Sequence, residues 1–415
     1  MAATTPLSDG AALAGAASGR RMLALVCAAL VLSMTTWFSA TAVTAPLAAS
    51  FGLDEAQASW LTNAVQIGFV VGALGLSISG LVDRAPLHRI MAASAGLAAL
   101  ANLALLWAPG PASALLARFV TGLALAGIYP PALKLIATWY RRGRGLALGA
   151  VIGALTLGSA LPHLLRALAS GLDWRTVVAS ASALTLAGAL LLGGFATEGP
   201  YAFARMPFRA RQIGVVLRDR GLFLTNLGYF GHMWELYAMW SWFLAFAAHA
   251  LPRSGLTDPK LPSLATFGVV AIGVVGCLLG GVLADRIGRT ATTAGMMAVS
   301  GACAFLIGFT FDGPAWLFLL IGAVWGISVV GDSAQFSAMA TEIGDPRLVG
   351  TALALQLGIG FALTVVAIRV LPLAVDAIGW QWSFLMLVPG PIIGVAAMLL
   401  LRRRPEAERI GGGLR

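Results

Sequence analysis

The chain consists of long apolar runs separated by short polar breaks. Twelve runs recur along it, at about 22–46, 57–80, 88–108, 112–138, 145–170, 174–196, 222–248, 264–284, 290–311, 315–340, 349–372 and 381–401. As a helix rising 1.5 Å per residue, each run is long enough to cross a hydrocarbon layer of about 30 Å. Membrane-spanning β-strands would instead alternate over about ten residues. The pattern therefore predicts an all-α integral membrane protein with twelve transmembrane helices.

Composition supports a membrane protein and argues against an enzyme. Of the 415 residues, 59% are hydrophobic and 11% are charged, whereas a soluble domain has about 25% charged residues. The sequence contains no phosphate-binding Gly-rich loop followed by Lys-Ser/Thr, no His/Cys metal spacing and no Gly-x-Ser-x-Gly elbow. We therefore expect no cofactor, no metal and no enzymatic activity, and we expect a gradient to supply the energy.

Basic residues are concentrated in every second polar break between the apolar runs. If both termini are cytoplasmic, the cytoplasmic side receives Arg20, Arg21, Arg84, Arg89, Arg141, Arg142, Arg144, the cluster between 205 and 220, Arg286, Arg289, Arg347 and Arg402 to Arg404. The opposite side receives Arg175, Arg253 and Lys260. This distribution follows the positive-inside rule and predicts a multi-pass protein of a bacterial inner membrane. The net charge of +10 then reflects topology and contact with anionic lipids, so we expect no nucleic-acid partner.

The two halves of the chain repeat one another. A basic, proline-containing break around 197–221 separates six runs from six, and "MTTWFSA" (34–40) matches "MWSWFLA" (239–245) about 200 residues later. This duplication predicts two pseudo-symmetric six-helix bundles with a solute site between them. We expect a disordered N-terminal tail over 1–21, bundles over 22–200 and 222–401, a basic cytoplasmic linker over 201–221 and a cytoplasmic tail over 402–415.

A loop motif gives the chain a family resemblance. "GVLADRIGR" (281–289) resembles the Gly-x-Leu-Ala-Asp-Arg-x-Gly-Arg signature of the major facilitator superfamily, and "SGLVDRAPLHR" (79–89) is a degraded first-half copy. The resemblance implies a secondary transporter that works by alternating access. It further implies that a set of loop charges latches the cytoplasmic gate: Asp83, Arg84, Asp285, Arg286 and Arg289. The alternative is that these charges only fix the topology.

Two further stretches refine the resemblance. "ARFVTGLALAG" (117–127) is similar to the family's Arg-x-x-x-Gly pattern, in which the arginine, here Arg118, is linked to proton coupling. Drug–proton antiporters of the superfamily carry Gly-x-x-x-Gly-Pro-x-x-Gly-Gly in the fifth span, but this chain reads "GALTLGSALPHLLR" (153–166). "GIYPPALKLIATWYRRGRGLALG" (127–149) and "DWR" (173–175) look more like the organic-anion, nitrate and cyanate porter branches.

The seventh run carries two ionisable residues at its centre. Glu235 lies near mid-bilayer in "NLGYFGHMWELYAMWSW" (226–242), and His232 lies one helical turn away on the same face. A carboxylate at this depth is costly, which makes it a candidate for function. Glu235 could carry a proton between two water compartments, and His232 could share the proton or contact the substrate. Alternatively, Glu235 is a structural carboxylate held by an arginine or by tryptophan N–H groups.

Two more charged residues are candidates for coupling or substrate binding. Arg118, in the fourth run, could capture a carboxylate or oxyanion with its bidentate guanidinium, or it could snorkel to the surface. Asp332, in the tenth run, could be a second protonatable site, a gate partner or a packed acid near the interface. By the family resemblance, the first, fourth, seventh and tenth helices line the cavity.

Aromatic and amide side chains complete the expected cavity wall. The candidates for this lining are Trp37, Tyr129, Tyr229, Trp240, Gln335 and Asn63. Aromatic walls would suit a planar or partly apolar solute, although large rings also fill space between helices. Asn63 and its neighbour Gln66 could instead be hydrogen-bonding contacts between helices, and Arg369 could snorkel to the interface.

Together these features predict a monomeric, proton-coupled symporter of a small organic, anionic solute. We expect its partners to be that solute, protons and membrane lipids. One alternative is a proton antiporter that exports an amphipathic or cationic compound, with Glu235 among aromatic rings as the cation site. Another is a non-transporting sensor built on a transporter scaffold.

Overall fold

The computed structural model describes residues 9–140, 144–201, 210–345 and 348–414. In the first half the helices are α1 (Asp9–Ser33), α2 (Thr44–Phe51), α3 (Glu55–Ser79), α4 (Leu81–Arg84), α5 (Leu87–Ala104), α6 (Pro111–Leu125), α7 (Tyr129–Ala137), α8 (Arg144–Leu168) and α9 (Trp174–Phe195). The positive-inside prediction also relied on Arg141, Arg142, Arg347 and part of the 205–220 cluster, which lie outside the described residues.

The second half is likewise helical. Its helices are α10 (Ile213–Arg218), α11 (Arg220–Ala250), α12 (Leu261–Ala271), α13 (Gly273–Ile287), α14 (Arg289–Leu306), α15 (Ala315–Gly331), α16 (Ser333–Ile343), α17 (Val349–Trp382) and α18 (Pro389–Arg402). Ten helical stretches in the described residues are long and apolar enough to cross a membrane. The last of them joins α17 and α18, and the 31-residue α11 is a further long helix, so all twelve predicted runs are helical. The all-α membrane fold is confirmed.

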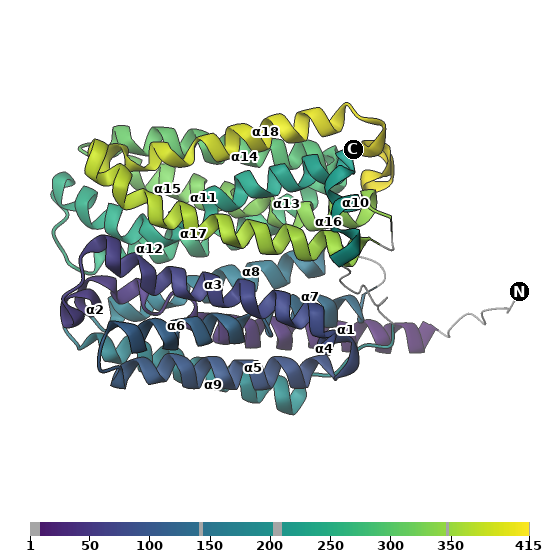
Figure 1. Ribbon diagram of the computed structural model, residues 1–415, viewed down its shortest axis with the longest axis horizontal. Coiled ribbons are helices and arrows are strands. Elements are labelled where there is room, and N and C mark those ends of the chain that lie inside the picture. Colours follow the sequence, from purple (N-terminus) through teal and green to yellow (C-terminus); the bar gives the residue numbers. More distant parts are fainter. Residues whose placement is uncertain (1–8, 141–143, 202–209, 346–347, 415) are drawn as a thin grey trace, which may run out of the picture.

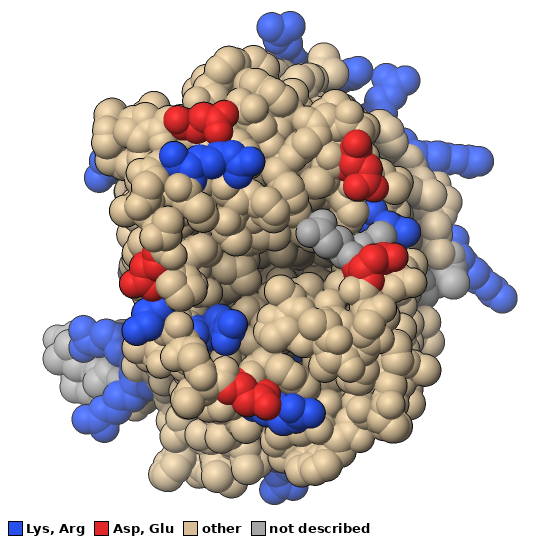
Figure 2. Space-filling model, turned by 90° about the vertical axis from the view of Figure 1, so that its left-hand side faces the viewer, with Lys and Arg blue, Asp and Glu red and all other residues tan. Residues whose placement is uncertain are grey.

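The two halves lie side by side, as Figure 1 shows, with the first half below and the second above. Along the seam between them α3 packs against α17, and α8 packs against α12 and α13. Both termini lie at one end of the molecule. Figure 2 views the other end, which is hollowed near its centre. The basic residues Arg175 and Arg253 of that end are each paired with an aspartate, Asp173 and Asp312.

Small residues allow the helices within each half to approach closely. A Cβ atom on Gly122 of α6 would collide with the carbonyl oxygen of Val65 on α3. In the second half, a Cβ on Gly280 of α13 would collide with the carbonyl oxygen of Gly331 on α15. At such interfaces, close van der Waals packing stabilises the helix pairs. Hydrophobic burial contributes little between helices that are surrounded by lipid.

Several spans are interrupted in their middle. The first span leaves the α-helix after Ser33 and continues through two 3-10 turns, η1 (Met34–Thr36) and η2 (Thr41–Val43). The fourth span breaks between α6 and α7, and the tenth breaks at Asp332 between α15 and α16. Such breaks expose backbone groups, which a membrane protein tolerates only where protein or a cavity surrounds them.

The terminal segments contain more helix than expected. The tail predicted to be disordered over 1–21 is helical from Asp9 onward, and residues 1–8 lie outside the described part. The predicted linker contains α10, which ends where Asp219 caps α11 by accepting a hydrogen bond from the Leu222 amide. The C-terminal tail forms η8 (Pro405–Gly413) and buries Ala407 and Ile410. Burial of these two side chains explains why the tail is folded.

Candidate functional site

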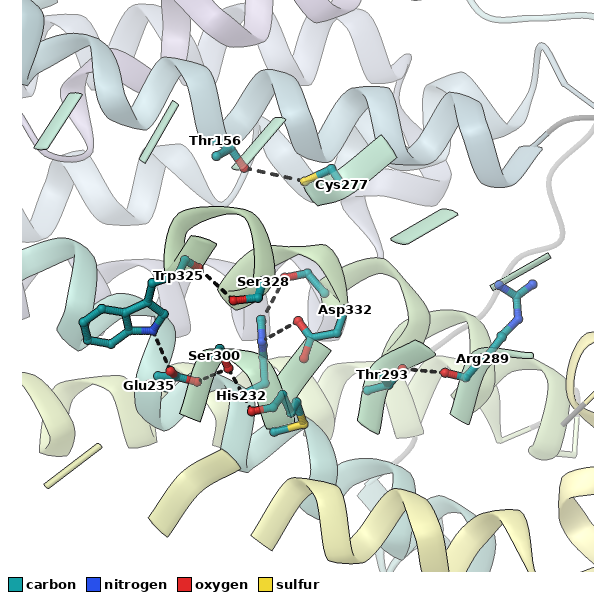
Figure 3. Close-up of polar contacts among 12 residues, drawn as sticks. Thr156, His232, Glu235, Cys277, Arg289, Thr293, Ser300, Trp325, Ser328 and Asp332 are labelled. Atoms are coloured by element: carbon teal, nitrogen blue, oxygen red, sulfur yellow. Dashed lines mark hydrogen bonds and ion pairs between the residues drawn. The ribbon is translucent and has the colours of Figure 1, made fainter. Parts of the chain in front are cut away.

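Glu235 lies at the middle of α11 and is 1% exposed. One carboxyl oxygen accepts a hydrogen bond from Nε1 of Trp325 on α15 (2.7 Å), and the other accepts one from the hydroxyl of Ser300 on α14 (2.8 Å), as Figure 3 shows. Both donors belong to the second half. The carboxyl group is therefore held inside its own bundle by neutral donors, one of the two alternatives considered from the sequence.

His232 lies one turn before Glu235 and contacts the break in the tenth span. Its Nδ1 atom is 2.9 Å from Oδ1 of Asp332, an ion-pair approach without good hydrogen-bond geometry. Its Nε2 atom is 2.8 Å from the hydroxyl of the half-buried Ser333. Asp332 lies at the break itself, directly after α15 and directly before α16. The helix break thus places an acid beside the imidazole (Figure 3).

Glu235, His232 and Asp332 lie in one region of the second half, with His232 and Asp332 in contact, and we call these three groups the ionisable cluster. Among the described residues, neither Glu235 nor Asp332 forms an ion pair with a lysine or arginine. The imidazole of His232 is the one group in the cluster that can become a cation. The cluster therefore consists of two carboxyl groups and one imidazole, each of which is chemically able to bind a proton.

Arg118 is fully buried and is held by neutral oxygen atoms. Its guanidinium donates to the carbonyl oxygens of Thr36 (2.9 Å), Trp37 (2.5 Å) and Leu61 (3.3 Å), and to Oδ1 of Asn102 (2.9 Å). Thr36 and Trp37 belong to the interrupted part of the first span. The arginine thus caps the carbonyl groups that the helix break leaves free. It does not snorkel to the surface, which was one of the two alternatives considered from the sequence, and it forms no ion pair with Glu235.

Aromatic side chains from both halves meet at the seam. Trp37 lies 4.9 Å from Phe69 and 5.6 Å from Tyr237, measured between ring centroids, and Phe69 lies 4.4 Å from Phe361. Trp240 joins the same group through Tyr237, at 5.6 Å. The expected cavity residues Trp37 and Trp240 are therefore packed together at the contact between the bundles.

The other expected cavity residues are spread more widely. Tyr229 lies 6.0 Å from the ring of His232, and Tyr129 lies half-buried at the start of α7. The carbonyl of Gln335 accepts a hydrogen bond from Arg289 (2.8 Å), which places it with the loop charges. Asn63 is fully buried, and neither of its amide atoms has a hydrogen-bond partner among the described residues.

The loop charges form ion pairs within each half. Asp83 pairs with Lys134 of α7, and Arg289 forms a bidentate pair with Glu342 of α16 (2.8–3.1 Å). Arg84, Asp285 and Arg286 form no ion pair with other described residues. Each of these pairs joins helices of one half, and the gating role of the loop charges stays a prediction.

The sequence analysis did not single out Glu342, the partner of Arg289, or Ser300 and Trp325, the partners of Glu235. Glu342 has a recognisable signal, since it is an acid at the inner end of the tenth run, close in space to a basic loop. Ser300 and Trp325 have no such signal, because hydroxyl and indole groups are common inside membrane helices. Among the described residues, no three His, Cys, Asp or Glu side chains come together as metal ligands.

Comparison with known proteins identifies a family. The family model described as Major Facilitator Superfamily matches residues 25–354 and 257–413. The chain is 26% identical to the 3-(3-hydroxy-phenyl)propionate transporter of Escherichia coli (strain K12) over 380 residues, which cover 87% of this chain and 89% of the relative. It is 27% identical over 207 residues to a probable sulfoacetate transporter of Cupriavidus necator, covering 46% of this chain and 47% of that relative.

A solved structure has the same fold. The crystal structure of a bacterial homolog of the human lysosomal transporter Spinster, inward-facing and unoccupied, superimposes with a TM-score of 0.70. The alignment covers 93% of this chain and 97% of that one at 16% sequence identity. At this identity the similarity concerns the arrangement of helices alone.

Proposed function

The chain belongs to the major facilitator superfamily, a family of secondary transporters rather than enzymes, and from that premise we propose that it imports a small organic anion together with protons. The proposal has two parts. The first is that the cluster of His232, Asp332 and Glu235 carries the protons. The second is that the solute is an organic acid.

The observation that carries the proton coupling is the buried contact between His232 and Asp332. Burial of ionisable groups in a membrane is costly unless they are neutralised or used. No lysine or arginine of the described residues pairs with this cluster, and we propose that bound protons neutralise it instead. The half-buried Ser333 connects His232 to less buried surroundings. Because the cluster spans the break at which α15 meets α16, its protonation state can bias the conformation of the tenth span.

The solute class is supported by the relatives. The names of both transporters, for 3-(3-hydroxy-phenyl)propionate and for sulfoacetate, describe small organic acids. Export of a cation would favour Glu235 exposed in an aromatic cavity, whereas its two oxygens are engaged by Trp325 and Ser300. We therefore favour symport of an anion over antiport of a cation.

We further propose that the end carrying both termini faces the cytoplasm of a bacterial cell. That end also bears the ion-paired loops around Asp83 and Arg289. A fluorescent protein fused to the C-terminus, which folds in the cytoplasm, should fluoresce, and a periplasmic phosphatase fused there should be inactive. The opposite pair of results would reverse the orientation.

The decisive experiment is solute-driven proton movement in proteoliposomes that contain a pH-sensitive dye. The solutes are 3-phenylpropionate, sulfoacetate and the lipophilic cation tetraphenylphosphonium. We expect a carboxylate gradient to move protons in the same direction as the solute. Asp332→Asn and Glu235→Gln should abolish proton movement, while Asp376→Asn, at an exposed acid, should leave it unchanged.

Each other result has a defined meaning. Proton movement opposite to tetraphenylphosphonium would replace symport by antiport. Full coupling in both Asp332→Asn and Glu235→Gln would remove the cluster from the mechanism. Movement of solute without protons in the wild type would leave a transporter that is not proton-coupled.

A further inference from the structure

Helix α3 carries two amide side chains for which the described part of the chain offers no hydrogen-bond partner. Asn63 and Gln66 are both 0% exposed, and none of their four amide atoms forms a hydrogen bond with the described residues. Buried polar groups in folded proteins are nearly always paired, so two unpaired amides one turn apart require an explanation. Polar side chains serving only as contacts between helices would be bonded to a neighbouring helix.

The position of Gln66 on the helix shows what it faces. Thr62, four residues earlier, forms a hydrogen bond with Thr41 of the interrupted first span (2.7 Å), and Phe69, three residues later, packs on Trp37. Residues spaced by three and four lie on one face of a helix. Gln66 therefore faces the break in the first span, where the indole Nε1 of the fully buried Trp37 is also unpartnered.

A guanidinium lies at the same level on the facing helix of the other half. Helices α3 and α17 run side by side in Figure 1, and their chains are antiparallel. Phe69 of α3 packs on Phe361 of α17 across the seam. Because the two chains run in opposite directions, residues before Phe69 lie at the same level as residues after Phe361. Asn63, six residues before Phe69, is therefore near the level of Arg369, eight residues after Phe361. The Nη1 atom of Arg369 is buried and has no partner among the described residues.

We propose that Asn63, Gln66 and Arg369, with Nε1 of Trp37, bind the carboxylate of a planar aromatic acid. Arginine binds carboxylates through two parallel hydrogen bonds, and the amide and indole N–H groups supply further donors. The ring of the solute packs against the aromatic side chains at the seam, which contact one another across the two bundles. This inference rests on the proposed function and assigns its substrate site and substrate class.

The assignment differs from the one that the sequence favoured. Arg118 was expected to capture the anion, but its donors are used by three carbonyl groups and Asn102. Arg369 was expected to snorkel, yet one of its nitrogen atoms is buried and unbonded. The proposed site also draws residues from both halves, so the bound anion links the bundles that must move relative to one another during transport.

The test is equilibrium binding to the purified full-length protein in detergent at constant pH, without a proton gradient. The probes are 3-phenylpropionate and the uncharged 3-phenylpropanamide, which has the same ring and length. We expect Arg369→Gln to raise the Kd of 3-phenylpropionate about tenfold or more, since a charged hydrogen-bonding partner is lost, and to leave the weak binding of the amide unchanged. Arg175→Gln, at an exposed arginine near the same end, is the matched control.

A second variant covers the case in which Arg369→Gln does not fold. Asn63→Asp keeps the size of the side chain but adds a carboxylate that competes with the solute for Arg369. It should raise the Kd of 3-phenylpropionate to a similar extent. Unchanged affinity in both folded variants, with normal carboxylate binding by the wild type, would overturn this site and leave the proposed function standing. A wild-type protein that neither binds nor moves any carboxylate would overturn the proposed function and this site with it.

Discussion

Arg118 offers the sharpest test of how the first span is built. We expect Arg118→Met, which removes the donors but keeps much of the side-chain volume, to destabilise the protein strongly. The Trp37 carbonyl would lose its side-chain donor. The carbonyl oxygen of Thr36 and Oδ1 of Asn102 would have to share the single proton of the Ser39 hydroxyl, so two buried acceptors in total would be left without a donor. Each unsatisfied buried group costs about 1–3 kcal/mol, which gives about 2–6 kcal/mol for the two.

Part of that loss is recovered, because the variant no longer buries a guanidinium that lacks an acidic partner. Desolvation of one buried ion costs several kcal/mol. We therefore expect a net destabilisation of about 2–4 kcal/mol. Arg118→Lys should restore little of it, since one ammonium group cannot reach acceptors on three sides.

Thermal unfolding in detergent can be followed with a dye that fluoresces on reacting with thiols. Cys277 and Cys303 are buried free cysteines, so their reaction with the dye reports loss of structure. Arg175→Met is the control, because its exposed pair with Asp173 contributes about 0–1 kcal/mol. An Arg118→Met variant that melts like the wild type would refute the capping role. A variant that melts like the wild type but binds carboxylates more weakly would indicate that Arg118 contacts the solute.

Three further predictions concern stability; the first two use the same thiol-reactive dye, and the third is followed by intrinsic tryptophan fluorescence, because thiols are protonated and unreactive in acid. Gly122→Ala should destabilise the protein by about 1–3 kcal/mol, because its Cβ collides with the backbone of α3, whereas Gly96→Ala, at an open helical position, should not. Glu342→Gln should cost about 1 kcal/mol, less at high salt, since its pair with Arg289 is partly exposed. Asp173 is the N-cap of α9, and the hydrogen bond from the Arg175 amide lowers the pKa of its carboxyl group from 3.8. The stability that this cap contributes should therefore be fully present above pH 3.8 and be lost as the pH falls through the lowered pKa. Asp173→Asn should remove this pH dependence.

The helices were predictable from the sequence because membrane insertion imposes a simple rule. Every backbone group in the hydrocarbon layer must be bonded within its own segment, so an apolar run of sufficient length becomes a helix. The basic loop motif and the repeat gave the family, which the comparisons confirm. The position of Glu235 at the middle of its helix also followed from counting residues along the run.

The partners of the buried charges were not predictable, because they come from distant parts of the chain. Trp325, the donor to Glu235, is 90 residues away in sequence, and Asn102 and Thr36 reach Arg118 from two other spans. Periodicity states which face of a helix is polar but not which neighbour that face meets. The sequence therefore left open whether Glu235 pairs with Arg118, and the packing of the bundles separates them into different networks.

By itself the sequence determined the membrane location, the helical spans, the twofold repeat and the set of buried ionisable residues. These properties depend on local hydropathy and on the spacing of residues along one chain segment. Tertiary structure alone decided that Arg118 donates to the carbonyl groups of a broken helix and that His232 meets Asp332. It also decided that the amide of Asn63 and Nη1 of Arg369 are buried without a hydrogen-bond partner among the described residues. The physical reason is that the chemistry of a buried polar group depends on the atoms within hydrogen-bonding distance, and these are set by the packing of whole helices.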